Sequence, residues 1–291
     1  MFTYAAKASP AASQTAWRWL PSGLLWCSVI AHAGAVVGAL AWPAYWPYWL
    51  ALIVANHAVL TVAGLLPRSR LLGPNLIRLP SAAVKRGEVA LTFDDGPDPE
   101  VTPQVLDLLD AANARATFFC VGQMVARYPD LAREIVRRGH LIENHTASHP
   151  KAFATYGWRR MLAELADGQR LIEQVTGRAP RFFRAVAGLR NPLLDPLLAR
   201  LGLRLATWTR RGYDTRCGKP GVVLRRLTRH LAAGDILLLH DAHSARTTQG
   251  APVALAVLPA LLAELQARSL RPVTLEAACK ASAVAQAKTT A

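Results

Sequence analysis

The feature that most constrains this chain is a run of 49 residues, 19–67, that contains no charged side chain. One α-helix of that length would be roughly 73 Å long at 1.5 Å per residue, whereas the hydrocarbon core of a bilayer is about 30 Å thick. The run must therefore fold back on itself. Pro43 and Pro47 mark a turn between two spans, about 22–42 and 48–66, so the sequence predicts a transmembrane helical hairpin.

The aromatic residues of this segment support a membrane location. Six of the eight tryptophans lie at or near the ends of the two spans, where amphipathic rings favour the headgroup layer: Trp17, Trp19, Trp26, Trp42, Trp46 and Trp49. The alternatives are a buried hydrophobic subdomain and a cleaved signal peptide, but no obvious cleavage site is present and a long segment precedes the first span. We interpret His32 and His57, inside the spans, as neutral packing residues rather than metal or proton sites.

The distribution of charge predicts an orientation for the hairpin. Residues 1–87 contain seven basic and no acidic residues, and the connecting turn contains neither. By the positive-inside rule, both ends of the hairpin face the cytoplasm of a bacterial-type inner membrane, and a periplasmic location is the alternative. The formal net charge of +15 fits attraction to anionic lipid headgroups. Nucleic-acid binding is not expected, because no recognition motif accompanies the basic residues.

The composition changes at Glu88, the first acidic residue of the chain, and this change divides the sequence. We predict an N-terminal cytoplasmic segment (1–21), the hairpin (22–66), a basic linker (67–87), a catalytic α/β domain (88–276) and a flexible tail (277–291). The four cysteines are too few and too scattered for a disulfide framework.

From residue 88 onward, short β-type runs alternate with amphipathic segments, which predicts parallel strands joined by crossover helices. The expected strands are 88–93, 116–121, 140–143, 181–184, 203–208, 235–240 and 271–275. The expected helices are 102–112, 129–138, 157–175, 192–200, 222–232 and 253–268. Seven strands and six crossovers indicate one barrel-like α/β domain, and a doubly wound open sheet is the alternative.

Polar residues follow the expected strands where each one ends, and in such folds reactive groups belong at the carboxyl ends of the strands. From the first, third, fourth, fifth and sixth strands in turn, these residues are Asp94 and Asp95, His145 and His149, Arg184, Asp214, and His240. We therefore expect five strand ends to deliver polar side chains to one rim.

Two short motifs at this rim suggest a metal site. The adjacent carboxylates of TFDDGP (92–97) repel each other at close range unless a divalent cation neutralises one of them. The histidines of HTASH (145–149) are four residues apart, so a helical turn would present both to one ion, and a nearby Asp would complete an open three-ligand site. Each motif alone also fits surface histidines or a solvated turn. Together they predict a Lewis acid that promotes hydrolysis of an amide or ester.

These residues resemble a known family over about 88–275. TFDDGP (92–97), GHLIENHTASHP (139–150) and LLLHD (237–241) are similar to motifs of the polysaccharide deacetylases, carbohydrate esterase family 4, which contain the nodulation deacetylase homology domain. The resemblance implies a distorted seven-stranded (β/α) barrel and a metal-dependent hydrolase that deacetylates N-acyl amino sugars. The metal in this family is commonly zinc, with cobalt, nickel and manganese as alternatives.

The resemblance also implies roles for individual residues. Asp94 matches the general base, and His240 matches the general acid. The metal ligands would be Asp95, His145 and His149.

Two partners would set the protonation states of the base and the acid. By resemblance, Arg184 would keep the base Asp94 ionised, and Asp214 would raise the pKa of His240 so that the imidazole is protonated. A rim salt bridge for Arg184 and a loop carboxylate for Asp214 are the alternatives.

The chain departs from the family in two motifs. The third motif, usually like RPPYG, is RAVAG (184–188), and the usual Asp-Trp of the fourth is DT (214–215), so we expect the aromatic wall for a sugar to be missing. Arg190, Arg210 and Arg211 are expected to bind an anionic group such as a phosphate, and a solvated basic loop is the alternative. The segment AGLR (187–190) resembles AG-x-R sequences of lipid-linked sugar deacylases.

The sequence thus predicts a membrane-bound hydrolase that removes an acetyl, formyl or other N-acyl group from an amino sugar, here a polyprenyl-phosphate-linked one at the inner membrane. A periplasmic deacetylase of peptidoglycan or another polysaccharide is the first alternative. A non-catalytic glycan-binding protein built on a decayed deacetylase barrel is the second.

Overall fold

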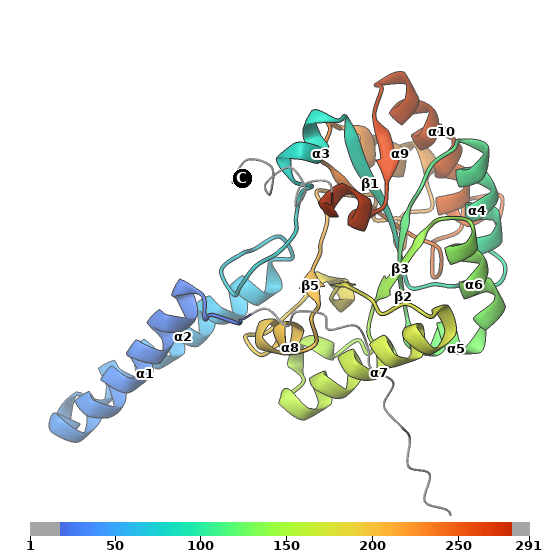
Figure 1. Ribbon diagram of the computed structural model, residues 1–291. Coiled ribbons are helices and arrows are strands. Elements are labelled where there is room, and N and C mark those ends of the chain that lie inside the picture. The colour runs from blue at the N-terminus through green and yellow to red at the C-terminus, as the bar shows by residue number, and fades with distance from the viewer. Residues whose placement is uncertain (1–17, 281–291) are drawn as a thin grey trace, which may run out of the picture.

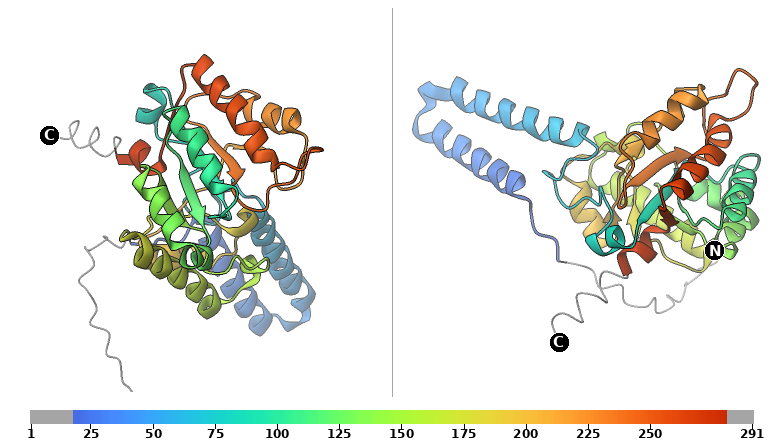
Figure 2. Two further views of the ribbon diagram at one scale, coloured as in Figure 1. Left: turned by 90° about the vertical axis from the view of Figure 1, so that its right-hand side faces the viewer. Right: turned by 90° about the horizontal axis from the view of Figure 1, so that it is seen from above.

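The computed structural model describes residues 18–280. The predicted cytoplasmic segment, up to residue 17, and the predicted tail from residue 281 lie outside the described residues. The hairpin consists of α1 (Gly23–Ala41), the short 3-10 helix η1 (Pro43–Tyr45) and α2 (Trp46–Leu65), and it projects from one side of the barrel (Figures 1 and 2). The two predicted apolar helices are therefore present, with the turn at Pro43.

The surface of the hairpin is apolar and exposed. Only 17% of α1 and 11% of the second candidate span are buried in the structure, and both are long and apolar enough to cross a membrane. Few polar groups bond within it: Asn56 Nδ2 donates to Ser28 Oγ across the two helices at 2.9 Å. His32 and His57 pack edge to face, with ring centroids 5.2 Å apart. These low burial values do not fit the core helices of a soluble domain.

The barrel is a curved, wholly parallel sheet. Its strands are β1 (Glu88–Asp94), β2 (Thr117–Cys120), β3 (Leu141–Asn144), β4 (Phe182–Phe183), β5 (Arg204–Leu205), β6 (Arg210–Arg211), β7 (Ile236–His240) and β8 (Arg271–Val273). The order is β5-β4-β3-β2-β1-β7-β6, and β8 pairs with β1 off this path. The predicted distorted α/β barrel is confirmed. Its sheet stays open between β5 and β6, and β6 is a strand that the sequence pattern does not predict.

Helices cover the outside of the sheet (Figure 2). They are α3 (Ser81–Lys85), α4 (Thr102–Ala111), α5 (Gly122–Arg127), α6 (Pro129–Arg137), α7 (Trp158–Thr176), α8 (Leu194–Arg200), α9 (Pro220–Thr228) and α10 (Val253–Ala267). Six of them correspond to predicted helices, whereas the short α3 and α5 do not. The main core lies between these helices and the central strands, where the rings of Phe93 and Phe118 stack with centroids 5.1 Å apart.

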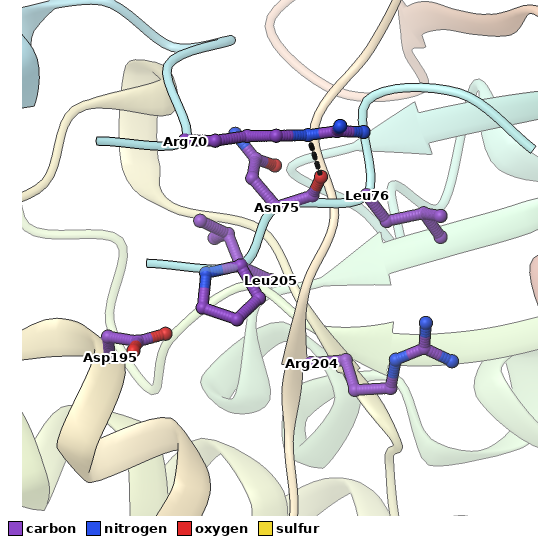
Figure 3. Close-up of a pocket in the computed structure, with 7 residues that line it drawn as sticks. Arg70, Asn75, Leu76, Asp195, Arg204 and Leu205 are labelled. Carbon is purple, nitrogen blue, oxygen red and sulfur yellow. Dashed lines mark hydrogen bonds between the residues drawn. The ribbon is translucent and has the colours of Figure 1, made fainter. Parts of the chain in front are cut away.

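The segment between hairpin and barrel packs along the sheet beside β5. Leu76 N donates to Leu205 O at 2.9 Å, and Thr207 N donates to Leu76 O at 3.0 Å. Arg70, Asn75 and Leu76 of this segment line a cavity of about 630 Å³, together with Asp195 of α8 and Arg204 of β5 (Figure 3). At the other end of the domain, residues 275–280 are helical and Ala278 is buried, so ordered structure continues past the predicted boundary at 276.

Candidate active site

A cleft of about 800 Å³ lies at the carboxyl ends of the strands. Its position follows from the register of the parallel sheet. Asp94 at the end of β1 pairs with His240 at the end of β7, and the end of β2 pairs with the end of β3. Polar residues that are distant in sequence therefore reach one rim. The predicted site residues that line the cleft are Asp94, Asp95, His145, His149, Arg211 and His240.

Three side chains at the bottom of the cleft form a group that can hold a metal ion. Asp95 Oδ1 lies 3.3 Å from His145 Nε2 and 3.1 Å from His149 Nε2. One donor atom from each side chain lies within 4.8 Å of the others. One carboxylate oxygen and two imidazole nitrogens are a donor set that suits zinc and related divalent cations.

The chain reaches this geometry through bends and not through a helical turn. Asp95, Thr146 and His149 have φ values of 79°, 71° and 53°. Asn144 Oδ1 accepts from Thr146 N at 2.8 Å, and Thr146 Oγ1 accepts from His149 N at 2.9 Å. These side chains satisfy backbone groups that a helix would use, so HTASH forms a bend. The helical turn predicted for this motif is wrong, although both imidazoles do reach Asp95.

The hydrogen bonds around the group orient its donor atoms toward one another. His145 Nδ1 donates to Arg184 O at 2.7 Å, which directs its Nε2 toward Asp95. Burial alone would raise the pKa of Asp95, but hydrogen bonds from His145, His149 and His243 hold this pKa far below its usual range. The carboxylate is therefore ionised, and the residues fit a divalent metal ion.

Arg184 fixes the first carboxylate of the Asp pair, Asp94. Its Nη1 donates to Asp94 Oδ1 at 2.6 Å and to Thr92 Oγ1 at 2.8 Å. The guanidinium is fully buried and lies over the ring of Phe119, 4.0 Å from its centroid. Asp94 is therefore held in place by a buried ion pair.

His240, beside Asp94 on the neighbouring strand β7, forms a second pair with Asp214. His240 Nδ1 donates to Asp214 Oδ1 at 2.9 Å, and the backbone N–H of His240 donates to Asp214 Oδ2 at 2.7 Å. Burial disfavours the imidazolium, but the hydrogen bond and charge of Asp214 outweigh it and raise the pKa of His240. The imidazole is thus suited to donate a proton from Nε2.

The structure separates the three predicted phosphate-binding arginines. Arg211 lines the cleft, where its guanidinium carbon lies 5.1 Å from the ring centroid of Trp208. Arg210 instead pairs with the buried Asp235 at 3.0 Å. Arg190 is buried against the segment after α2, and its Nη2 donates to Ser69 O at 2.6 Å. Neither Arg190 nor Arg210 is among the residues that line the cleft.

Several cleft residues were not predicted from the sequence. Trp208 lines the cleft, so an aromatic surface is present although the fourth motif lacks its tryptophan. Lys151 and Arg216 add exposed cations at the mouth. His243 Nδ1 lies 3.4 Å from Asp95 Oδ2, and its side chain is 75% exposed. The sequence signal that could have indicated His243 is its position three residues after His240 of the LLLHD motif.

Asp241 lies directly behind the metal-binding group. Burial raises its pKa to about 7, although Asp241 Oδ2 accepts from Thr102 Oγ1 at 2.6 Å. A Cβ on Gly96 would meet Asp241 Oδ2 at 2.1 Å. The glycine that follows the Asp pair is therefore required by this close approach.

Comparisons with known proteins agree with this geometry. A family model described as Polysaccharide deacetylase matches residues 81–206. The chain is 34% identical over 188 residues to a peptidoglycan-N-acetylglucosamine deacetylase of Bacillus cereus, covering 64% of this chain and 85% of that protein. It is 32% identical over 157 residues to a chitooligosaccharide deacetylase of Azorhizobium caulinodans, covering 54% and 74%.

A solved structure has the same fold. The Bc1960 peptidoglycan N-acetylglucosamine deacetylase superposes with a TM-score of 0.63 at 26% identity, covering 71% of this chain and 92% of that chain.

The first prediction concerns metal affinity. His149→Ala removes one of three donors and is expected to weaken Zn²⁺ binding by more than about 100-fold, whereas His243→Ala, which removes a partner of Asp95, should weaken it about tenfold. Competition with a chromophoric chelator measures both values on the full-length protein in detergent. Gln123→Ala, at the cleft wall, is the control and should bind Zn²⁺ like the unchanged protein. Unchanged affinity in His149→Ala would contradict the proposed ligand set.

Proposed function

Because the chain belongs to the polysaccharide deacetylase family, whose members hydrolyse N-acetyl amide bonds of sugars, we propose that it is a metal-dependent N-deacetylase acting on an N-acyl amino sugar in the cleft described above. The observation that carries this proposal is the grouping of Asp95, His145 and His149 beside two buried charge pairs. Those pairs are Asp94 with Arg184 and His240 with Asp214.

The cleft residues divide the reaction between them. Asp95, His145 and His149 would hold a divalent cation, which would supply a Lewis acid for the scissile amide carbonyl. Asp94, held in place by Arg184, takes the proton of the attacking water. His240 gives a proton to the departing amine, which leaves as the free amino group of the sugar. A carboxylate, Asp214, neighbours the acid and raises the pKa of His240, and a cation, Arg184, neighbours the base.

We further propose that the substrate carries a phosphate that links the amino sugar to a polyprenyl lipid. Two observations support this choice. Lys151, Arg211 and Arg216 place three cations around the cleft. The loop 186–190, part of which lines the cleft, contacts the end of α2, so the cleft lies beside the base of an apolar hairpin.

Two other functions remain as alternatives. The names of the relatives favour a peptidoglycan or chitooligosaccharide deacetylase. A non-catalytic glycan-binding protein is supported by the altered third and fourth motifs. It is disfavoured because the two charge pairs and the three donor side chains are all present with bonded geometry.

The second prediction tests catalysis and substrate together. Full-length protein in membranes is expected to release acetate or formate from a lipid-linked N-acyl amino sugar, detected by mass spectrometry. Asp94→Asn should lower kcat by at least about 100-fold, because a positioned base contributes that much or more. Asp107→Asn, on the exposed face of α4, is the matched control.

The outcomes separate the candidate functions. Release from peptidoglycan but not from the lipid-linked sugar would overturn the substrate choice and keep the deacetylase. Full biological activity of Asp94→Asn would indicate binding without hydrolysis.

The third prediction concerns pH dependence. Asp214→Asn removes the charge that raises the pKa of His240, so the protonated imidazole is lost at a lower pH than in the unchanged protein. The alkaline limb of the kcat/KM profile should therefore move to lower pH. A profile that keeps its alkaline limb in place would show that His240 is not the acid.

The fourth prediction concerns orientation. We propose that the hairpin spans a bacterial-type inner membrane, with the catalytic domain in the cytoplasm, because basic residues flank both ends of the hairpin. A fluorescent protein fused after Leu66 should fluoresce, and alkaline phosphatase fused there should be inactive. The reverse pattern would place the cleft in the periplasm and favour a cell-wall polymer as substrate.

A further inference from the structure

The base of the hairpin packs directly against a loop that forms one side of the cleft. Arg190 N, at the end of the loop 186–190, donates to Gly64 O in the last turn of α2 at 3.1 Å. A Cβ on Gly64 would lie 2.2 Å from Arg190 O, so helix and loop are in van der Waals contact at the glycine. The same loop supplies Val186, Ala187 and Gly188 to the cleft wall.

A second contact fixes the middle of the loop. Gly188 has a φ of 76°, and a Cβ there would meet Pro67 Cβ at 2.7 Å and the ring of Trp208 at 2.6 Å. Ala187 also lies in the left-handed region, with a φ of 55°. Two consecutive left-handed residues, one of them not glycine, need support from their surroundings. Pro67, one residue beyond the C-cap of α2, supplies part of that support.

Hydrogen bonds continue from the base of the hairpin to the pair that contains the general base. Asn75 Nδ2 donates to Pro67 O at 2.9 Å and to Ser69 O at 3.0 Å. Thr207 Oγ1 donates to Asn75 Oδ1 at 2.9 Å. Thr207 O in turn accepts from Arg184 Nη2 at 2.9 Å.

The segment after α2 is itself held on the barrel. Figure 3 shows Arg70, whose Nε donates to Asn75 O at 3.4 Å, above the cavity that this segment closes over β5. The residues that line this cavity differ from those that line the cleft. The cavity therefore marks where the segment rests on the barrel, and it is separate from the cleft.

From these contacts we infer that the last turn of α2 and residues 65–69 are a positioning element of the cleft, in addition to any role as a membrane anchor. They hold the loop 186–190 in the conformation that forms one wall of the cleft. In this chain the wall is built from small residues, RAVAG, backed by Pro67 and Gly64 from outside the barrel. The kinetic test of this inference measures deacetylation, so that test rests on the proposed function.

The test is a pair of glycine substitutions on the hairpin, made in full-length protein in detergent so that no bilayer orients the cleft. Gly64→Val places methyl groups where Arg190 O lies. Gly34→Val, on α1, is the matched control, because nothing lies within 4 Å of a Cβ at that position. Gly64→Val is expected to raise KM on the order of tenfold, with a smaller change in kcat, since a displaced wall alters substrate positioning. Zn²⁺ affinity should not change, because no metal ligand moves.

A gentler variant covers the case in which Gly64→Val does not fold. Pro67→Ala keeps Cβ but removes the ring Cγ beside Gly188 and frees the backbone at residue 67, and Pro74→Ala in the same segment is its control. Pro67→Ala should raise KM in the same direction by a smaller factor, and Pro74→Ala should not.

Hydrogen exchange provides a readout that does not depend on activity. The amide of Arg190, which donates to Gly64 O, should exchange faster in Gly64→Val than in Gly34→Val. Equal exchange and equal KM in the two variants would overturn the inference. Absence of deacetylation by the unchanged protein, with faster exchange in Gly64→Val, would instead refute the proposed function and leave the positioning role intact.

Discussion

The candidate site depends on the burial of one guanidinium group. Arg184 has no exposed surface, and a charge in that position is costly unless its donors are satisfied. Its donors reach Asp94, Thr92 and two backbone carbonyls of the segment after β5. Its own carbonyl accepts from His145 Nδ1. Arg184 therefore orients the proposed general base, Asp94, through its side chain and the proposed metal ligand His145 through its backbone carbonyl. The positions of the base and of this ligand both depend on Arg184.

Much of the fold can be predicted from the sequence, because buried parallel strands and their covering helices leave clear hydrophobic patterns. The strand ends then indicate which polar residues meet, and Asp95, His145 and His149 lie together as the motifs predict. The strand β6 has two residues, which is too short for a hydrophobic pattern. It is defined by its pairing with β7. The helical turn predicted for HTASH is wrong because the side chains of Asn144 and Thr146 bond to the backbone, which bends there instead.

The long basic side chains were the hardest to place. Arg190, Arg210 and Arg211 are close in sequence, yet only Arg211 lines the cleft. A guanidinium group can reach several ångströms in any direction, so its position depends on which acceptor is buried nearby. Arg210 pairs with Asp235, which is 25 residues away in the sequence, and no local sequence pattern predicts that pair. The cations at the cleft mouth are instead Lys151 and Arg216, which lie two residues after His149 and Asp214.

The contacts at the base of the hairpin also explain how the altered third motif can be tolerated. RAVAG differs from the family motif at Ala185, Val186 and Ala187 but keeps its glycine, Gly188. Pro67 and Trp208 pack closely at Gly188, and the loop end is bonded to Gly64. Because a side chain at Gly188 would collide with Pro67, the packing of the helix base requires the glycine and not the residues that differ. The loop is therefore held from outside the barrel, so its departure from the family pattern does not by itself indicate loss of catalysis.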